Sequence, residues 1–87
     1  MRILAEPIDA IVIFKGKNKP RPFKFRYCDG DDVIHEIKID KIIQEEETKI
    51  AGIKAFIYRC QSEIDGSIKV YELKYRVAEC RWELYKM

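Results

Sequence analysis

The stretch 56-FIYRCQSEIDGSIKVYELKY-75 determines the fold of this chain. At its centre lies Asp65-Gly66, a dipeptide preferred in the two-residue type I′ turn of a β-hairpin. Counting outward from that turn pairs three residues with three others: Cys60 with Tyr71, Tyr58 with Leu73, and Phe56 with Tyr75. The same count sets Arg59 opposite Glu72 on the reverse face, so both faces sort correctly. The stretch therefore predicts a long antiparallel hairpin.

An earlier hairpin is predicted around Cys28-Asp29-Gly30-Asp31-Asp32, a turn composition in which glycine can adopt a positive φ. Before it, aromatic residues alternate with cations from Phe23 to Tyr27, the two-residue period of a half-buried strand. A five-residue loop between the strands predicts this cross-strand pairing: Tyr27 with Val33, Phe25 with His35, and Phe23 with Ile37, with Lys24 facing Glu36 on the other side.

The rest of the chain also favours strands, because isoleucine occurs 14 times and leucine only three times, and β-branched residues suit a pleated surface. We expect a strand from Ala10 to Lys15, preceded by an extended stretch around Ile3. A further strand should run to about Ile43. A charged loop or short helical turn should follow it to Lys49.

The apolar positions change phase once near the C-terminus, from odd numbers over Tyr71–Val77 to even numbers over Cys80–Leu84. One extra residue near Ala78-Glu79 produces such a change. The pattern favours a β-bulge that bends one long strand. A tight turn between two separate strands is the alternative.

Together these patterns predict one all-β domain over residues 1–87, with five or six antiparallel strands, mostly a meander, forming a strongly curved sheet or small barrel. The predicted core consists of apolar residues from all the strands: Ile11, Ile13, Phe23, Phe25, Ile37, Ile39, Phe56, Tyr58, Leu73, Tyr75, Val77, Trp82 and Leu84.

Size and composition narrow the classes of function. A chain of 87 residues has one small core, so a deep active-site cavity is improbable. Domains of this size are often only marginally stable, and many are stabilised by dimerisation. The longest apolar run, Ala10–Phe14, is far shorter than the roughly 20 residues of a membrane-spanning helix. Glu6 and Pro7 interrupt any signal-peptide core. An odd count of three cysteines without a Cys-x-x-Cys spacing favours reduced thiols and a cytoplasmic location.

Catalytic and metal-binding patterns are weak. Cys28, His35, Cys60 and Cys80 could supply the four ligands of a Cys3His zinc site, but their spacing matches no zinc finger. His35 falls on the apolar face of the first hairpin and is more typical of a half-buried sheet histidine than of a general base. No phosphate-binding or hydrolase motif occurs. We therefore expect no enzyme activity, no cofactor, no metal and no small-molecule substrate.

One segment has an unusual charge pattern. Residues 15–26 carry six positive charges and no acid, while residues 29–47 carry eight acids, although the net charge is only +2. The candidate contacts for a nucleic acid are therefore Lys15, Lys17, Lys19, Arg21, Lys24 and Arg26. Bases would need exposed rings on which to stack, and the candidate rings are Trp82, Tyr85, Tyr71 and Phe25. The alternative is a lysine-rich loop that keeps an edge strand soluble.

A family resemblance covers most of the chain. It rests on Glu6-Pro7-Ile8, on Arg21-Pro22 with Phe25, on Tyr58-Arg59, on Gly66 with Tyr71-Glu72-Leu73 and Tyr75, and on Arg81-Trp82 with Leu84-Tyr85. In these residues the chain resembles a family of small bacterial all-β domains of unknown function, some of which are associated with Y-family translesion DNA polymerases. The resemblance implies a fold and a context of genome maintenance. It assigns no catalytic residue.

The expected function is that of a non-enzymatic accessory or interaction module, which associates with itself or docks on a protein partner. A hydrophobic stretch, Ala55–Tyr58, supports this because it is apolar on both faces, as in a central strand or a strand covered by another chain. The alternative is a nucleic-acid-binding small barrel that uses the basic segment. No membrane partner is expected.

Overall fold

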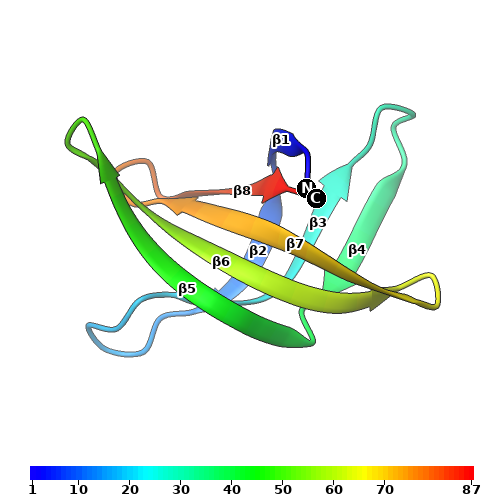
Figure 1. Ribbon diagram of the computed structural model, residues 1–87, viewed down its shortest axis with the longest axis horizontal. Coiled ribbons are helices and arrows are strands. Elements are labelled where there is room, and N and C mark those ends of the chain that lie inside the picture. Colours follow the sequence, from blue (N-terminus) through cyan, green and yellow to red (C-terminus); the bar gives the residue numbers. More distant parts are fainter.

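Eight β-strands and no helix make up the structure, a computed structural model that describes residues 1–87 (Figure 1). The strands are β1 (Ile3–Pro7), β2 (Asp9–Ile13), β3 (Arg21–Cys28), β4 (Ile34–Lys38), β5 (Lys41–Ile50), β6 (Ile53–Ile64), β7 (Ser67–Arg76) and β8 (Arg81–Lys86). The all-β antiparallel class is confirmed, with eight strands where five or six were predicted. The structure has no helix with the length and hydropathy needed to cross a bilayer.

The strands form two sheets, in the orders β1-β8-β7-β6-β5 and β2-β3-β4. The chain passes from one sheet to the other at two corners, Ile8 and Ile39-Asp40. At these corners Ile8 N donates to Trp82 O (3.3 Å) and Asp40 N donates to Gln61 O (3.1 Å). Strands that change sheets in this way make the corners of a folded-over sheet pair. The result is a strongly curved pair of sheets without the continuous ladder of a closed barrel.

The β6–β7 hairpin has the predicted register. Tyr58 pairs with Leu73 and Arg59 with Glu72. The hairpin turn has φ of 51° at Asp65 and 79° at Gly66, and positive values at both positions define the type I′ turn. The reading of this hairpin from its turn is confirmed.

The β3–β4 hairpin has the predicted faces but a different register. Phe25 pairs with Ile37 and Tyr27 with His35, which displaces the predicted pairing by two residues. The Asp29 carboxylate holds the turn, because its Oδ1 accepts from the amides of Asp31 (2.8 Å) and Val33 (3.1 Å). This side-chain cap moves the turn one residue along the chain, to residues 29–33.

The predicted bulge near Ala78-Glu79 is wrong, and the alternative of a tight turn is correct. Strands β7 and β8 are separate and antiparallel, with Arg76 paired to Arg81. The turn closes where Cys80 N donates to Val77 O (3.3 Å), with Cys80 at a φ of 52°. The change of apolar phase therefore arises from the turn.

The predicted charged loop before Lys49 is also wrong, because β5 continues as one strand to Ile50. Its residues pair with β6 up to the tight turn at Ala51-Gly52. Pairing to a long central neighbour overrides the weak β-propensity of consecutive glutamates. A bulge at Ile43 is the one irregularity in this pairing.

The core lies between the two sheets and includes most of the predicted residues. Its centre is formed by Phe25 of the small sheet against Tyr71 of the large sheet, with ring centroids 5.4 Å apart. Trp82 and Val77 pack at its margin. Buried residues that the prediction omitted are Pro20, Pro22, Ala55, Cys60, Ser62, Tyr71 and Glu72.

Three predicted core residues are exposed instead: Ile11 (62%), Ile13 (44%) and Phe23 (46%). The exposure of Phe23 arises from a bulge in the β2–β3 pairing, where Ile11 pairs with Lys24 and Val12 with Pro22, so that Phe23 has no partner. The bulge buries Pro22 and turns Phe23 outward. Ile11 and Ile13 face solvent for another reason: Ala10 pairs with the buried Phe25, so the even-numbered residues of β2 face the core.

Candidate interaction surface on the β2–β3 hairpin

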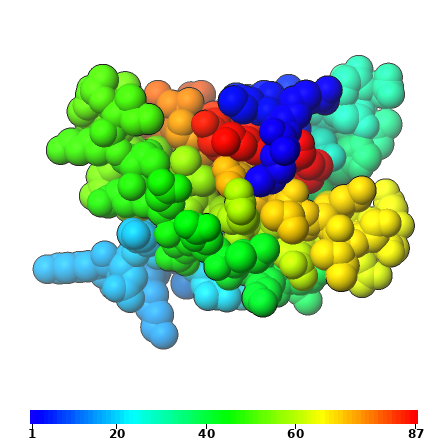
Figure 2. Space-filling model, in the orientation of Figure 1, coloured from blue at the N-terminus to red at the C-terminus, as the bar shows by residue number.

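The basic segment forms the connection between β2 and β3. Ile13 pairs with Arg21, which leaves residues 14–20 as the loop. Its tip is turned by Gly16 at a φ of +61° and closed by Asn18 N, which donates to Lys15 O (3.1 Å). The loop is anchored where the Tyr58 hydroxyl of the large sheet donates to the buried Pro20 carbonyl. Figure 2 shows the loop projecting from the body of the molecule.

The six candidate cations divide into two groups. Lys24 is paired with Glu36, and Arg26 Nε lies 2.9 Å from Asp9 Oδ2. The other four are exposed and have no acid within 4.0 Å: Lys15, Lys17, Lys19 and Arg21. These four carry a positive charge that the fold leaves unneutralised.

The nucleic-acid hypothesis needs exposed rings beside the basic loop, and the four candidate rings do not lie there. Phe25 and Tyr71 are buried in the core. Trp82 is half-buried against Tyr75, with ring centroids 4.9 Å apart. Tyr85 is half-buried between two lysine side chains of the outer face. None of the four is a free platform beside the basic loop.

Two other rings do lie beside it, and sequence reasoning missed both as exposed groups. Phe14 begins the loop and is 60% exposed, although its ring makes an edge-to-face contact with the Tyr75 ring, with centroids 6.2 Å apart. Phe23 follows the loop at the bulge and is 46% exposed. The adjacency of Phe14 to Lys15 was the available signal for the first. The bulge at Phe23 had no such signal.

We define the basic hairpin surface by its exposed apolar and cationic residues: Ile11, Ile13, Phe14, Lys15, Lys17, Lys19, Arg21 and Phe23. One of its cations also touches the large sheet, since Lys19 Nζ lies 5.3 Å from the centroid of the Phe56 ring. A surface that combines large apolar groups with charges of one sign is typical of a binding site for a macromolecule.

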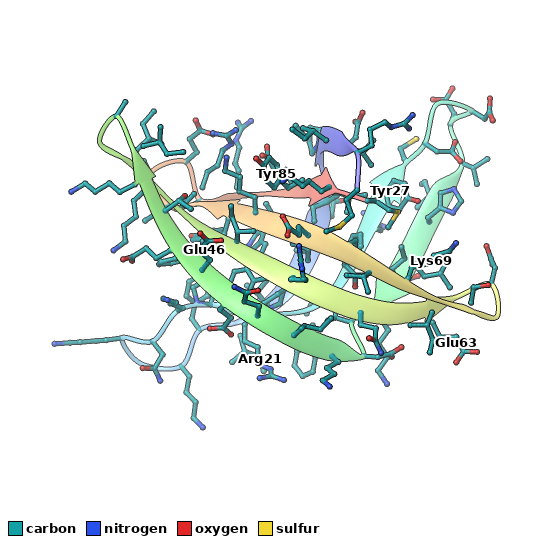
Figure 3. The ribbon with its side chains drawn as sticks, in the orientation of Figure 1. Arg21, Tyr27, Glu46, Glu63, Lys69 and Tyr85 are labelled. Carbon is teal, nitrogen blue, oxygen red and sulfur yellow. The ribbon has the colours of Figure 1, made fainter.

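An acidic surface lies on the neighbouring edge strand. Glu45, Glu46 and Glu47 occupy the middle of β5, and Glu47 Oε1 lies 3.1 Å from Lys54 Nζ. Glu45 pairs with Tyr58, and burial, with a smaller contribution from the Glu45 charge, raises the pKa of the Tyr58 hydroxyl. Glu46, labelled in Figure 3, lies between Glu45 and Glu47 in sequence, so the alternation of the strand directs it to the face opposite theirs.

The cysteines and the histidine are distributed over the fold. Cys60 is buried, and burial raises the pKa of its thiol to about 12. Cys28 and Cys80 are exposed at the ends of β3 and of the β7–β8 turn. His35 Nε2 lies 2.6 Å from Asp29 Oδ2, a contact that lowers the pKa of the Asp29 carboxyl. No three His, Cys, Asp or Glu side chains converge in a geometry that would hold a metal ion.

No family model, curated protein or solved structure matches this chain. The resemblance to the bacterial all-β family therefore stays a prediction from the sequence.

Proposed function

We propose that this chain is a non-enzymatic interaction module that associates with itself, or docks on a protein partner, through the basic hairpin surface. The observation that supports this is the exposure of Ile11, Ile13, Phe14 and Phe23, between 44% and 62%, around one hairpin. Large apolar side chains grouped in this way and bordered by charges mark an interaction site more often than a solvated face.

The size of the surface predicts a weak association. Fully burying an isoleucine or phenylalanine side chain contributes about 1.5–3 kcal/mol, and these four are already about half buried. Covering them contributes about 3–6 kcal/mol on each of two molecules, and much of that total offsets the lost freedom of the two free molecules. A dissociation constant in the range of about 10 to 1000 μM is therefore expected.

Sedimentation equilibrium over about 5 to 1000 μM protein tests this, because a reversible dimer makes the apparent mass depend on concentration. The mass should rise from the 10.4 kDa of one chain toward twice that value. Phe14→Ala with Phe23→Ala should abolish the rise. A matched control, Ile68→Ala with Val70→Ala, removes two other exposed apolar side chains and should leave it unchanged. A constant mass over the whole range would overturn self-association.

A second function, binding of single-stranded nucleic acid, is favoured by a separate observation: four unpaired cations border Phe14 and Phe23. Cations that follow a phosphate backbone beside rings that accept bases are the common design of such sites. Fluorescence anisotropy with labelled mixed-sequence DNA and RNA tests it. Four phosphate contacts predict a slope of about −2.8 for log K against log salt on single strands. Absence of binding even at low salt would reject this function.

A further inference from the structure

The proposed function leaves the partner undefined. The negative charge and exposed isoleucines of strand β5 bear on which partner fits the basic hairpin surface. We define the acidic strand surface as the free edge of β5 with the side chains that border it on both faces: Ile43, Glu45, Glu46, Glu47 and Ile50. Its two isoleucines are exposed, at 45% and 72%, and flank the three glutamates. The composition therefore mirrors that of the basic hairpin surface: apolar groups next to charges, with the opposite sign.

The two surfaces are neighbours in one molecule but do not neutralise each other. Glu45 pairs with Tyr58, and the Tyr58 hydroxyl binds the Pro20 carbonyl at the end of the basic loop. Lys19 lies over Phe56, whose partner across the strands is Glu47. The acidic and basic blocks of the sequence nevertheless share just one ion pair, between Lys24 and Glu36. Apart from Glu47, which pairs with Lys54, the charges of both surfaces stay available to a second molecule.

We propose that the partner is a second copy of this chain, placed by a twofold axis so that each basic hairpin surface covers the acidic strand surface of the other. This inference rests on the proposed function. Two complementary surfaces side by side on one protomer satisfy the rule for such a contact, in which each surface is used twice and the assembly closes as a dimer.

The other symmetric contacts are unfavourable. Pairing the β5 edge with the β5 edge of a second copy would bring the glutamates of two strands against each other, and like charges opposite one another destabilise a sheet. The bulge at Ile43 also disrupts the edge that would pair. Contact of hairpin with hairpin would oppose the lysines in the same way. Only the basic hairpin surface on the acidic strand surface joins opposite charges.

Charge reversal in two separate variants tests this geometry. The first carries Lys15→Glu, Lys17→Glu, Lys19→Glu and Arg21→Glu, which changes the net charge from +2 to −6. The second carries Glu45→Lys and Glu46→Lys, which changes it from +2 to +6. All six side chains are exposed, so folding should be kept, and circular dichroism checks this. Each variant alone should stay monomeric, and an equal mixture should form a heterodimer.

A matched control separates the specific contact from general attraction between oppositely charged proteins. Glu63→Lys with Glu79→Lys also gives a net charge of +6, at exposed positions outside the acidic strand surface. Figure 3 shows Glu63 near the β6–β7 turn, away from Glu46. Mixed with the first variant, this control should give at least about tenfold weaker association at physiological salt, where exposed charges more than about 8 Å apart are largely screened. Equal association of both mixtures would overturn the proposal.

The outcomes also separate this inference from the proposed function. If the unaltered protein dimerises and loses dimerisation with Phe14→Ala and Phe23→Ala, but neither charge variant affects it, the function stands and the partner geometry is wrong. If the unaltered protein stays monomeric, this inference falls together with self-association, and docking on a different protein is what is left of the proposed function. If the unaltered protein binds single-stranded nucleic acid and the mixture of charge variants forms no heterodimer, the second function is supported and this geometry is rejected.

Discussion

Replacing Ser62 with alanine is expected to destabilise the protein more than replacing Ser62 and Tyr71 together. Ser62 Oγ lies 2.6 Å from Lys38 O and 2.7 Å from the Tyr71 hydroxyl. The Lys38 carbonyl can only accept, so the single Ser62 hydroxyl proton is directed to it. The Tyr71 hydroxyl must therefore donate to Ser62. Burial raises the pKa of Tyr71, which keeps that proton in place.

This proton order fixes the magnitudes. Tyr71→Phe removes one neutral hydrogen bond and should cost about 1 kcal/mol. Ser62→Ala removes two and leaves the fully buried Tyr71 hydroxyl without an acceptor, which adds about 1–3 kcal/mol to a loss of about 2 kcal/mol. The double variant loses the same two bonds but has no stranded hydroxyl, so it should cost about 2 kcal/mol. Tyr71→Phe should thus restore stability when Ser62 is already alanine.

Urea unfolding of the four proteins measures these differences as a double-mutant cycle. Ser67→Ala, an exposed serine after the β6–β7 turn, is the matched control and should change stability by no more than about 0.5 kcal/mol. Equal losses for Tyr71→Phe and Ser62→Ala, or a double variant less stable than Ser62→Ala, would refute the assigned proton order.

Gly66→Ala should lower stability by about 1–2 kcal/mol in urea unfolding, because an L-residue is strained at the φ of +79°; an unchanged midpoint would contradict the turn geometry. Burial raises the pKa of Cys60 to about 12, so iodoacetamide near about pH 8 should modify two of the three thiols in the native protein and all three in urea, as counted by mass spectrometry. The same raised pKa predicts that stability falls above about pH 9, where the unfolded thiol ionises and the folded one does not; a urea midpoint that stays constant into that range would exclude the effect. His35→Ala should raise the pKa of Asp29 toward its ordinary value, because the His35 contact is the largest cause of its depression. Carboxyl NMR titration reads this directly, and an unchanged titration would show that the turn amides alone hold the carboxylate.

The parts of the fold that the sequence predicted correctly depend on local chemistry. Asp65-Gly66 fixes its own turn, and that turn fixes every pair of the β6–β7 hairpin. The β3–β4 register was predicted wrongly because the alternation of apolar and polar residues shows only which face a residue is on. A displacement of two residues leaves every residue on its predicted face. The register of this hairpin depends on Asp29, whose carboxylate caps the turn. The sequence does not show that Asp29 is the capping residue and that Asp31 or Asp32 is not.

The candidate site was predicted in part, for a similar reason. The exposed cations of residues 15–21 follow from the loop-forming prolines and Asn18. The exposure of Phe23 follows from a bulge that depends on how β2 meets β3. The acidic strand surface depends on the pairing of β5 with β6 across the Ala51-Gly52 turn, which consecutive glutamates do not indicate.

The pairing of β1 with β8 has a consequence for how the molecule folds. Ile3 pairs with Lys86, and the backbones of Arg2 and Met87 exchange two hydrogen bonds (2.9 and 3.0 Å). Contacts so distant in sequence carry the largest loop-closure entropy and slow folding. We expect the β6–β7 hairpin to nucleate early, whereas β1 can dock only after β8 is in place. On the ribosome, β1 emerges before β8 and would wait for it.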